Sequence, residues 1–166
     1  MRKGLAILAG LAVLAAANAT VFQRERLLAD GQVAILELAP RDPRSLMQGD
    51  YMALRFKLAV EVGERRSANE PDHDGRLVVR PDAEGVARLV RRDQGEPLGA
   101  GELALRYRVR HGEMKFATNA FFFQEGEGPR YARARYGEFR VAPSGEMLLT
   151  HLLDENRQRL GGAAPR

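Results

Sequence analysis

The sequence predicts a mainly β protein, an antiparallel sandwich or small barrel of about eight strands, preceded by one N-terminal hydrophobic helix. Two observations support this fold class. Apolar and polar residues alternate along several short segments after Gly31, as they do in half-buried strands. Stretches rich in Gly, Pro and Asp separate these segments and are typical of turns. We therefore expect one β-rich domain over residues 31–155 and a flexible polar tail over residues 156–166.

The N-terminal segment, residues 1–30, is expected to be a signal-anchor helix with a short stalk. Arg2 and Lys3 precede an uncharged and largely apolar stretch, Leu5 to Phe22. A helix needs about 20 such residues to cross a bilayer, so this stretch is near the short limit. No helix breaker follows until Gly31, a natural stop. Basic residues before the apolar stretch favour a cytoplasmic N-terminus, which predicts an inner-membrane, single-pass protein with its C-terminal domain in the periplasm.

Two alternatives for this segment stay open. Small residues at Ala17 and Ala19, before Thr20, are typical of a signal-peptide cleavage site. Cleavage after Ala19 would release a soluble periplasmic protein. The other alternative is a buried helix of a cytoplasmic protein.

Alternation predicts the strands in chain order. A first strand is expected at residues 33–38. A long strand is expected from Met52 to Val62, where six apolar residues at period two occupy one face. Further strands are expected at residues 77–80, 86–90, 103–109, 114–124, 136–141 and 147–153.

Composition argues against most kinds of reactive site. The absence of cysteine excludes disulfides, thiol catalysis and thiolate metal sites. The net charge of +4 includes Arg2 and Lys3, so the rest of the chain is nearly balanced and not typical of a nucleic-acid binder. Asp72, His73 and Asp74 resemble a ligand cluster but fall in a polar loop. We expect no enzyme activity, no cofactor and no metal site.

The main candidate contact site runs from the loop after the first predicted strand into the start of the second: Asp42, Pro43, Arg44, Gly49, Asp50, Tyr51, Leu54 and Phe56. Pro43 restricts φ, Gly49 permits positive φ, and Asp50 can accept bonds from nearby amides. These properties favour a shaped loop that sets the register of the next strand. The functional alternative is a docking surface for a partner, and one loop can serve both purposes.

A second candidate stretch is the aromatic run Phe121 to Phe123, followed by Glu125 and Gly126. On a strand, Phe121 and Phe123 share one face and Phe122 takes the other. Either both faces are covered, or one ring is left for a partner or the membrane surface.

Arginines recur at alternate positions 106, 108 and 110, and further arginines stand at positions 133, 135 and 140. This basic stripe is either a solvated strand face or a surface that meets anionic headgroups.

Both candidate stretches resemble those of the bacterial GDYXXLXY family. Gly49, Asp50, Tyr51 and Leu54 occupy the motif positions, and Phe56 replaces the last tyrosine. The run that ends at Phe123 is similar to the second recurring stretch of that family, as aromatics followed by Glu-Gly. The resemblance implies a single-helix protein that exposes a β-domain outside the inner membrane, often associates with multi-pass membrane proteins, and has no established activity.

Leu46 to Asp50 also looks like half of the nucleophile stretch of membrane-anchored Ser–Lys signal peptidases. The serine position of that stretch is Arg41 here, and Ser45 falls where a threonine would stand. We therefore do not expect peptidase activity.

The function expected from these observations is a non-enzymatic accessory protein that docks on an integral membrane partner. The alternative is a soluble periplasmic β-domain that binds a small ligand inside a barrel.

Overall fold

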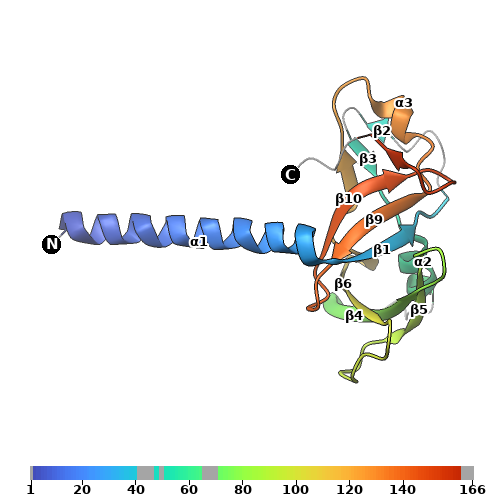
Figure 1. Cartoon of the computed structure of the whole chain (residues 1–166), viewed down its shortest axis with the longest axis horizontal. Coiled ribbons are helices and arrows are strands. Elements are labelled where there is room, and N and C mark those ends of the chain that lie inside the picture. Colours follow the sequence, from blue (N-terminus) through green and yellow to red (C-terminus); the bar gives the residue numbers. More distant parts are fainter. Residues whose placement is uncertain (1, 41–46, 49–50, 65–70, 162–166) are drawn as a thin grey trace.

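The structure, a computed structural model, describes residues 2–40, 47–48, 51–64 and 71–161. One long helix, α1 (Arg2–Asp30), projects from the side of a β-rich domain as a single rod (Figure 1). Within the described residues, the domain is built mainly from antiparallel strands, which confirms the predicted fold class.

Two four-stranded sheets form the body of the domain. The first has the order β1-β9-β10-β11, and the second has the order β5-β4-β6-β7. The strands of the first sheet are β1 (Gln32–Glu37), β9 (Tyr136–Val141), β10 (Met147–Leu153) and β11 (Arg159–Leu160). Those of the second are β4 (His73–Pro81), β5 (Ala87–Arg92), β6 (Leu103–Arg110) and β7 (Glu113–Lys115). Side chains from both sheets form one hydrophobic core, which includes Leu36, Leu77, Leu105 and Phe139.

Alternation identifies β6 well. Leu105, Tyr107 and Val109 are buried, whereas Arg106 and Arg108 between them are exposed. The predicted strands at residues 33–38, 77–80, 86–90, 103–109, 136–141 and 147–153 each correspond to a strand of these two sheets.

The long strand predicted from Met52 to Val62 is wrong. A short strand, β3 (Tyr51–Ala53), is followed by a helix, α2 (Lys57–Glu64). The helix buries Leu58, Ala59 and Val62, whose spacing suits a helix and not a strand. Leu58 and Val62 fit both periodicities, so only the burial of Ala59 in place of Val60 distinguishes the two.

The single strand predicted at residues 114–124 is divided into β7 and β8 (Ala120–Phe122), which belong to different sheets. Thr118 makes the break, because its hydroxyl lies 2.7 Å from the Ala120 carbonyl oxygen and 3.2 Å from the Ala120 amide nitrogen. This local bonding turns the chain between the two strands.

The expected flexible tail contains a strand. Arg159 and Leu160 form β11, which pairs with the end of β10, and the Leu160 side chain is buried in the core. A two-residue strand in a polar context has too few positions to show alternation.

Hydrogen bonds, an ion pair and apolar packing join the end of α1 to the domain. The Gly31 amide donates to the Leu27 carbonyl oxygen at 3.0 Å, and the Arg140 guanidinium donates to the Gly31 carbonyl oxygen at 3.0 Å. Arg24 forms an ion pair with Glu146 at 3.1 Å, and Leu27 is buried. The predicted stop at Gly31 is confirmed, and these contacts set the direction in which the helix leaves the domain.

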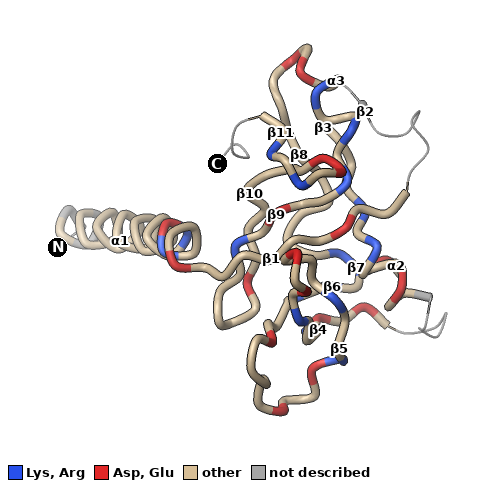
Figure 2. The backbone as a smooth tube through the Cα atoms, turned by 45° about the vertical axis from the view of Figure 1, so that its right-hand side comes forward, with Lys and Arg blue, Asp and Glu red and all other residues tan. Residues whose placement is uncertain are grey.

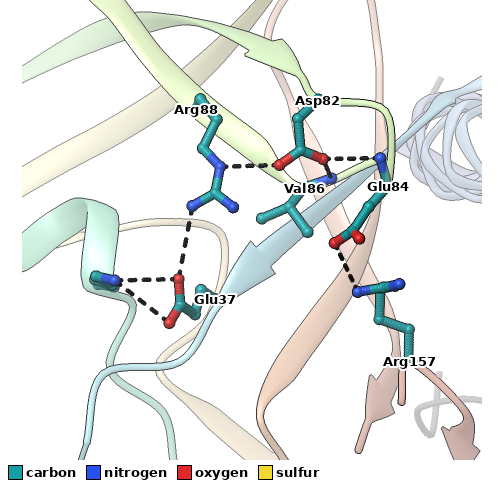
Figure 3. A network of polar contacts seen from close by, with 7 residues as sticks. Glu37, Asp82, Glu84, Val86, Arg88 and Arg157 are labelled. Carbon is teal, nitrogen blue, oxygen red and sulfur yellow. Dashed lines mark hydrogen bonds and ion pairs between the residues drawn. The ribbon is translucent and has the colours of Figure 1, made fainter. Parts of the chain in front are cut away.

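A polar network ties the two main sheets together (Figure 3). Glu37 of β1 lies 3.3 Å from Lys57 of α2 and 3.8 Å from Arg88 of β5. Asp82 accepts bonds from the Arg88 side chain and from the Val86 amide in the β4–β5 turn. Burial raises the pKa of Asp82, but these bonds outweigh it and hold the pKa below the usual value.

Candidate functional site

The family-like motif contributes to a third sheet, with the order β2-β3-β8. β2 (Met47–Gln48) pairs with β3, and β3 pairs with β8 so that Tyr51 lies opposite Phe122 and Met52 opposite Phe121. The structure therefore brings the two candidate stretches together as neighbouring strands. We call β2, β3 and β8 the motif sheet.

The chain after β3 is bonded on both sides. The Leu54 amide donates to the Asn119 carbonyl oxygen at 2.6 Å, and the Ala39 amide donates to the Arg55 carbonyl oxygen at 2.8 Å. Leu38 and Phe56 form an isolated antiparallel bridge. These bonds position the motif segment between β8 and the end of β1.

Two motif residues are core residues. Leu54 and Phe56 are almost fully buried. The Phe56 ring meets Phe116 and Phe139 edge-on, with centroid separations of 5.9 Å and 5.4 Å. This geometry gives them a packing role and excludes them from a contact surface.

The aromatic run has one exposed ring. Phe121 is buried, and Phe123 is half-buried and stacks on Tyr131 at a centroid distance of 5.4 Å. Phe122 is 59% exposed, and its ring lies 5.8 Å from that of the half-buried Tyr51. The sequence left open whether both faces of this run are covered or one ring stays exposed. In the structure, the Phe122 ring stays exposed.

Glu125 and Gly126 lie in an exposed turn between β8 and α3 (Gly128–Tyr131). Gly126 has a φ of +85°, which a residue with a Cβ rarely adopts. The glycine is thus explained by the turn, and Glu125 presents its carboxylate to solvent.

The remaining predicted contact residues, Asp42, Pro43, Arg44, Gly49 and Asp50, lie outside the described residues.

The profile of the family described as "GDYXXLXY protein" matches residues 13–152, which include both candidate stretches. The chain belongs to the GDYXXLXY family. Comparisons with curated proteins and with solved structures found no match.

In this GDYXXLXY protein, the side chains of Asp72, His73 and Asp74 contact different residues and do not converge on one point. Asp72 accepts a bond from the His111 amide at 2.8 Å, and Asp74 pairs with Arg110 at 2.7 Å. His73 lies 3.4 Å from the Tyr107 hydroxyl. Within the residues that the structure describes, no group of three or more such side chains is placed to hold a metal ion.

Two surface grooves flank the motif segment of the family member. One, of about 420 Å³, is lined by Leu54, Arg55, Arg135 and Glu155 among others. The second, of about 380 Å³, lies on the other side against Val60 of α2. Both grooves open to solvent, whereas the space between the sheets is filled by core side chains.

Sequence reasoning missed two charged clusters of this GDYXXLXY protein. The first surrounds Glu138, a carboxylate in an apolar stretch that gave no sign of a partner. The second joins Arg106 and Arg108 to Arg24 and Lys115 around a groove beside α1. Alternating arginines on β6 signalled this surface, but residues 24 and 115 could be added only from the tertiary structure.

Proposed function

We propose that this GDYXXLXY protein is a non-enzymatic accessory protein, anchored in the inner membrane by α1, whose periplasmic domain docks on an integral membrane partner through the motif sheet. The observation that carries the proposal is the exposed Phe122 ring beside Tyr51 on the sheet that the family motif builds.

The helix supports the anchoring part of the proposal. Residues Ile7–Asp30 of α1 form a helix long and apolar enough to cross a membrane, and none of its most apolar window is buried against the domain. Arg2 and Lys3 precede this span, which favours a cytoplasmic N-terminus and a periplasmic domain.

The motif sheet supports the docking part. β8 stands at the edge of this sheet, so one side of the strand has no neighbouring strand among the described residues. Exposed aromatic rings are enriched in the centres of protein interfaces, because each ring removes a large apolar area from water on binding. Phe122 and Tyr51 together provide such a surface, whereas Leu54 and Phe56 hold the strand beneath it.

The alternative of a released ligand-binding domain receives less support. A ligand inside a barrel needs an empty interior, and the interior is filled where Phe56, Phe116 and Phe139 meet. The groove of about 420 Å³ beside the motif carries charged residues of both signs and opens to solvent, whereas small-molecule sites are mostly apolar and enclose their ligands.

Photo-crosslinking tests the docking proposal in the native membrane. A benzophenone amino acid replaces Phe122 in the full-length chain, and a matched variant carries it at Leu98, an exposed position between β5 and β6. We expect one multi-pass membrane protein to be crosslinked from position 122 and not from position 98, with Met1 still present on the recovered chain. Equal labelling from both positions, or a recovered chain that starts at Thr20, would contradict the proposal.

A further inference from the structure

A basic groove lies beside the end of α1. It has a volume of about 300 Å³, and its charged lining residues are Arg24, Arg106, Arg108, Lys115 and Glu146. We call it the stalk groove. Four side chains are cationic and one is anionic, so the groove is strongly electropositive.

The cations of the stalk groove are only partly neutralised. Glu146 pairs with Arg24 at 3.1 Å, and Lys115 lies 3.6 Å from the exposed Glu113. Arg106 and Arg108 are exposed and form no ion pair within the described part of the chain. These two guanidinium groups are therefore available to an anion, and a guanidinium can bind phosphate oxygens in a bidentate manner.

The joint with α1 sets the position of the groove relative to a membrane. Arg24 itself lines the groove and follows Phe22, the last residue of the uncharged stretch, by two positions, a rise of about 3 Å along the helix. The headgroup layer of a bilayer adds roughly 5 to 7 Å on each side of the hydrocarbon core. If α1 spans a membrane, the groove opens at the depth of the lipid phosphates.

Several contacts fix the orientation of the domain relative to the end of α1, and so keep the groove at this depth. Leu27 is buried at the joint, and Arg140 is bonded to the Gly31 carbonyl oxygen, so the helix end is attached at more than one point. Arg106 is held from the other side, because its amide donates to the Gly145 carbonyl oxygen at 2.9 Å in the β9–β10 turn. Figure 2 shows charged residues where α1 meets the domain, directly after its uncharged length.

We propose that the stalk groove binds the phosphate group of an anionic phospholipid in the bilayer that α1 crosses. This inference rests on the proposed anchoring by α1 but not on the docking partner. Binding holds the domain against the membrane surface and thereby sets the orientation of the motif sheet. Charge complementarity with a polyanionic surface is the physical basis, and it weakens as salt increases.

The test measures how closely the groove approaches the lipid headgroups in the full-length protein. The chain has no cysteine, so a single cysteine at Ala117, an exposed residue of the groove, can carry a fluorophore. The protein is inserted in vesicles of phosphatidylcholine alone or mixed with phosphatidylglycerol, each with a quencher on a trace of headgroups. A second labelled variant, with the cysteine at Leu98, reports on the β5–β6 loop, which does not line the groove.

We expect stronger quenching at position 117 in the anionic vesicles than in the neutral ones, with a smaller difference at high salt. Arg106→Glu and Arg108→Glu should each lower the fraction of docked protein about fivefold or more, since a basic residue near an anionic surface contributes a factor of that order. Arg133→Glu is the matched control. It makes the same charge change at an exposed residue just after α3, away from the end of α1 in Figure 1.

Two results would overturn the inference. One is equal quenching at position 117 in both kinds of vesicle while the protein remains inserted, which leaves the anchoring proposal intact. The other is an equal loss of quenching in the Arg108→Glu and Arg133→Glu variants. A protein that does not insert in either vesicle contradicts the anchoring proposal itself and the groove proposal with it.

Discussion

Among single residues of this protein, Glu138 is a carboxylate that is buried and held by several polar partners. Only 7% of the Glu138 surface is exposed. Its Oε1 atom lies 3.0 Å from the Arg159 guanidinium, 3.2 Å from the Thr150 hydroxyl and 3.3 Å from His151 Nδ1. An irregularity in the pairing of β9 and β10 between Leu149 and His151 leaves Thr150 beside the carboxylate. Burial raises the pKa of Glu138, but the bonds from Arg159 and Thr150 outweigh it and lower the pKa below the usual 4.5.

The lowered pKa predicts how stability depends on pH. A carboxyl whose pKa is lower in the folded than in the unfolded state stabilises the protein above its unfolded pKa, and this contribution is lost as pH falls through the folded value. We expect Glu138→Gln to lower the free energy of unfolding by roughly 1–2 kcal/mol at pH 7. The difference between wild type and variant should shrink below pH 4.5. Urea unfolding from pH 7 to pH 3 measures both, and a constant difference across this range would contradict the prediction.

Two phenylalanines test the division between core and surface at the motif sheet. Phe56 is enclosed by Phe116 and Phe139, whereas Phe122 is mostly exposed. Phe56→Ala should lower the free energy of unfolding by about 3–5 kcal/mol, because it leaves a cavity in the core. Phe122→Ala, the same chemical change, should alter it by about 0.5 kcal/mol or less and reduce partner crosslinking instead. Chemical denaturation of both variants checks the prediction, and a large loss of stability in the Phe122 variant would place this ring in the core.

At the scale of elements, α2 is the segment where tertiary packing overrides the sequence pattern. Its buried face combines Leu58, Ala59 and Val62 and lies beside β1 and β7. A strand over the same residues would bury Val60 and expose Ala59 to solvent.

Two aspartate substitutions therefore distinguish the helix from the strand. Ala59→Asp should lower the free energy of unfolding by about 3 kcal/mol or more, because it places an unpaired carboxylate in the core. Val60→Asp should cost much less, since residue 60 is half-buried at the edge of an open groove. Thermal unfolding of the two variants is the measurement, and the reverse order of stabilities would support the strand.

At the scale of the whole molecule, the joint at Gly31 determines the orientation of the domain relative to α1. A Cβ atom at this position would lie 2.4 Å from the Leu27 carbonyl oxygen and 3.1 Å from the Arg140 Cβ atom. The residue is needed for this close approach and not for a positive φ. Any larger side chain must therefore displace the domain from the helix end.

Gly31→Val is expected to loosen the joint without unfolding the sheets. Spin labels at Asn18 of α1 and Ser144 of the β9–β10 turn should show a narrow distance distribution in the wild type and a broad one in the variant. Gly10→Val is the matched control, because nothing lies within 4 Å of a Cβ atom there. An unchanged distribution in the Gly31 variant would show that the joint does not depend on this glycine.

Much of the fold follows from patterns of short range. The uncharged N-terminal stretch and Gly31 predict α1 and its end, and both are confirmed. The strands of the two main sheets follow from alternation, because half-buried strands with one wet face leave a clear period of two. The family motif was also recognisable, since Gly49, Asp50, Tyr51 and Leu54 are consecutive or nearly so.

The candidate site was predicted less completely than the fold. The motif residues and the Phe-Glu-Gly stretch were identified, but not that β3 and β8 pair and leave Phe122 exposed. Alternation put Leu54 and Phe56 on the apolar face of a predicted strand, but the motif also made them candidate contact residues, and the structure decides between the two by burying both.

Residue order alone predicts the long apolar helix, the antiparallel β class and membership of the GDYXXLXY family, because each depends on neighbours along the chain. The folded structure alone reveals the choice of helix for α2, the pairing of the two family stretches, and the grouping of Arg24 with Arg106, Arg108 and Lys115. These features join residues far apart in the chain. Which of them meet depends on how the apolar faces pack together, and that packing leaves no local pattern in the sequence.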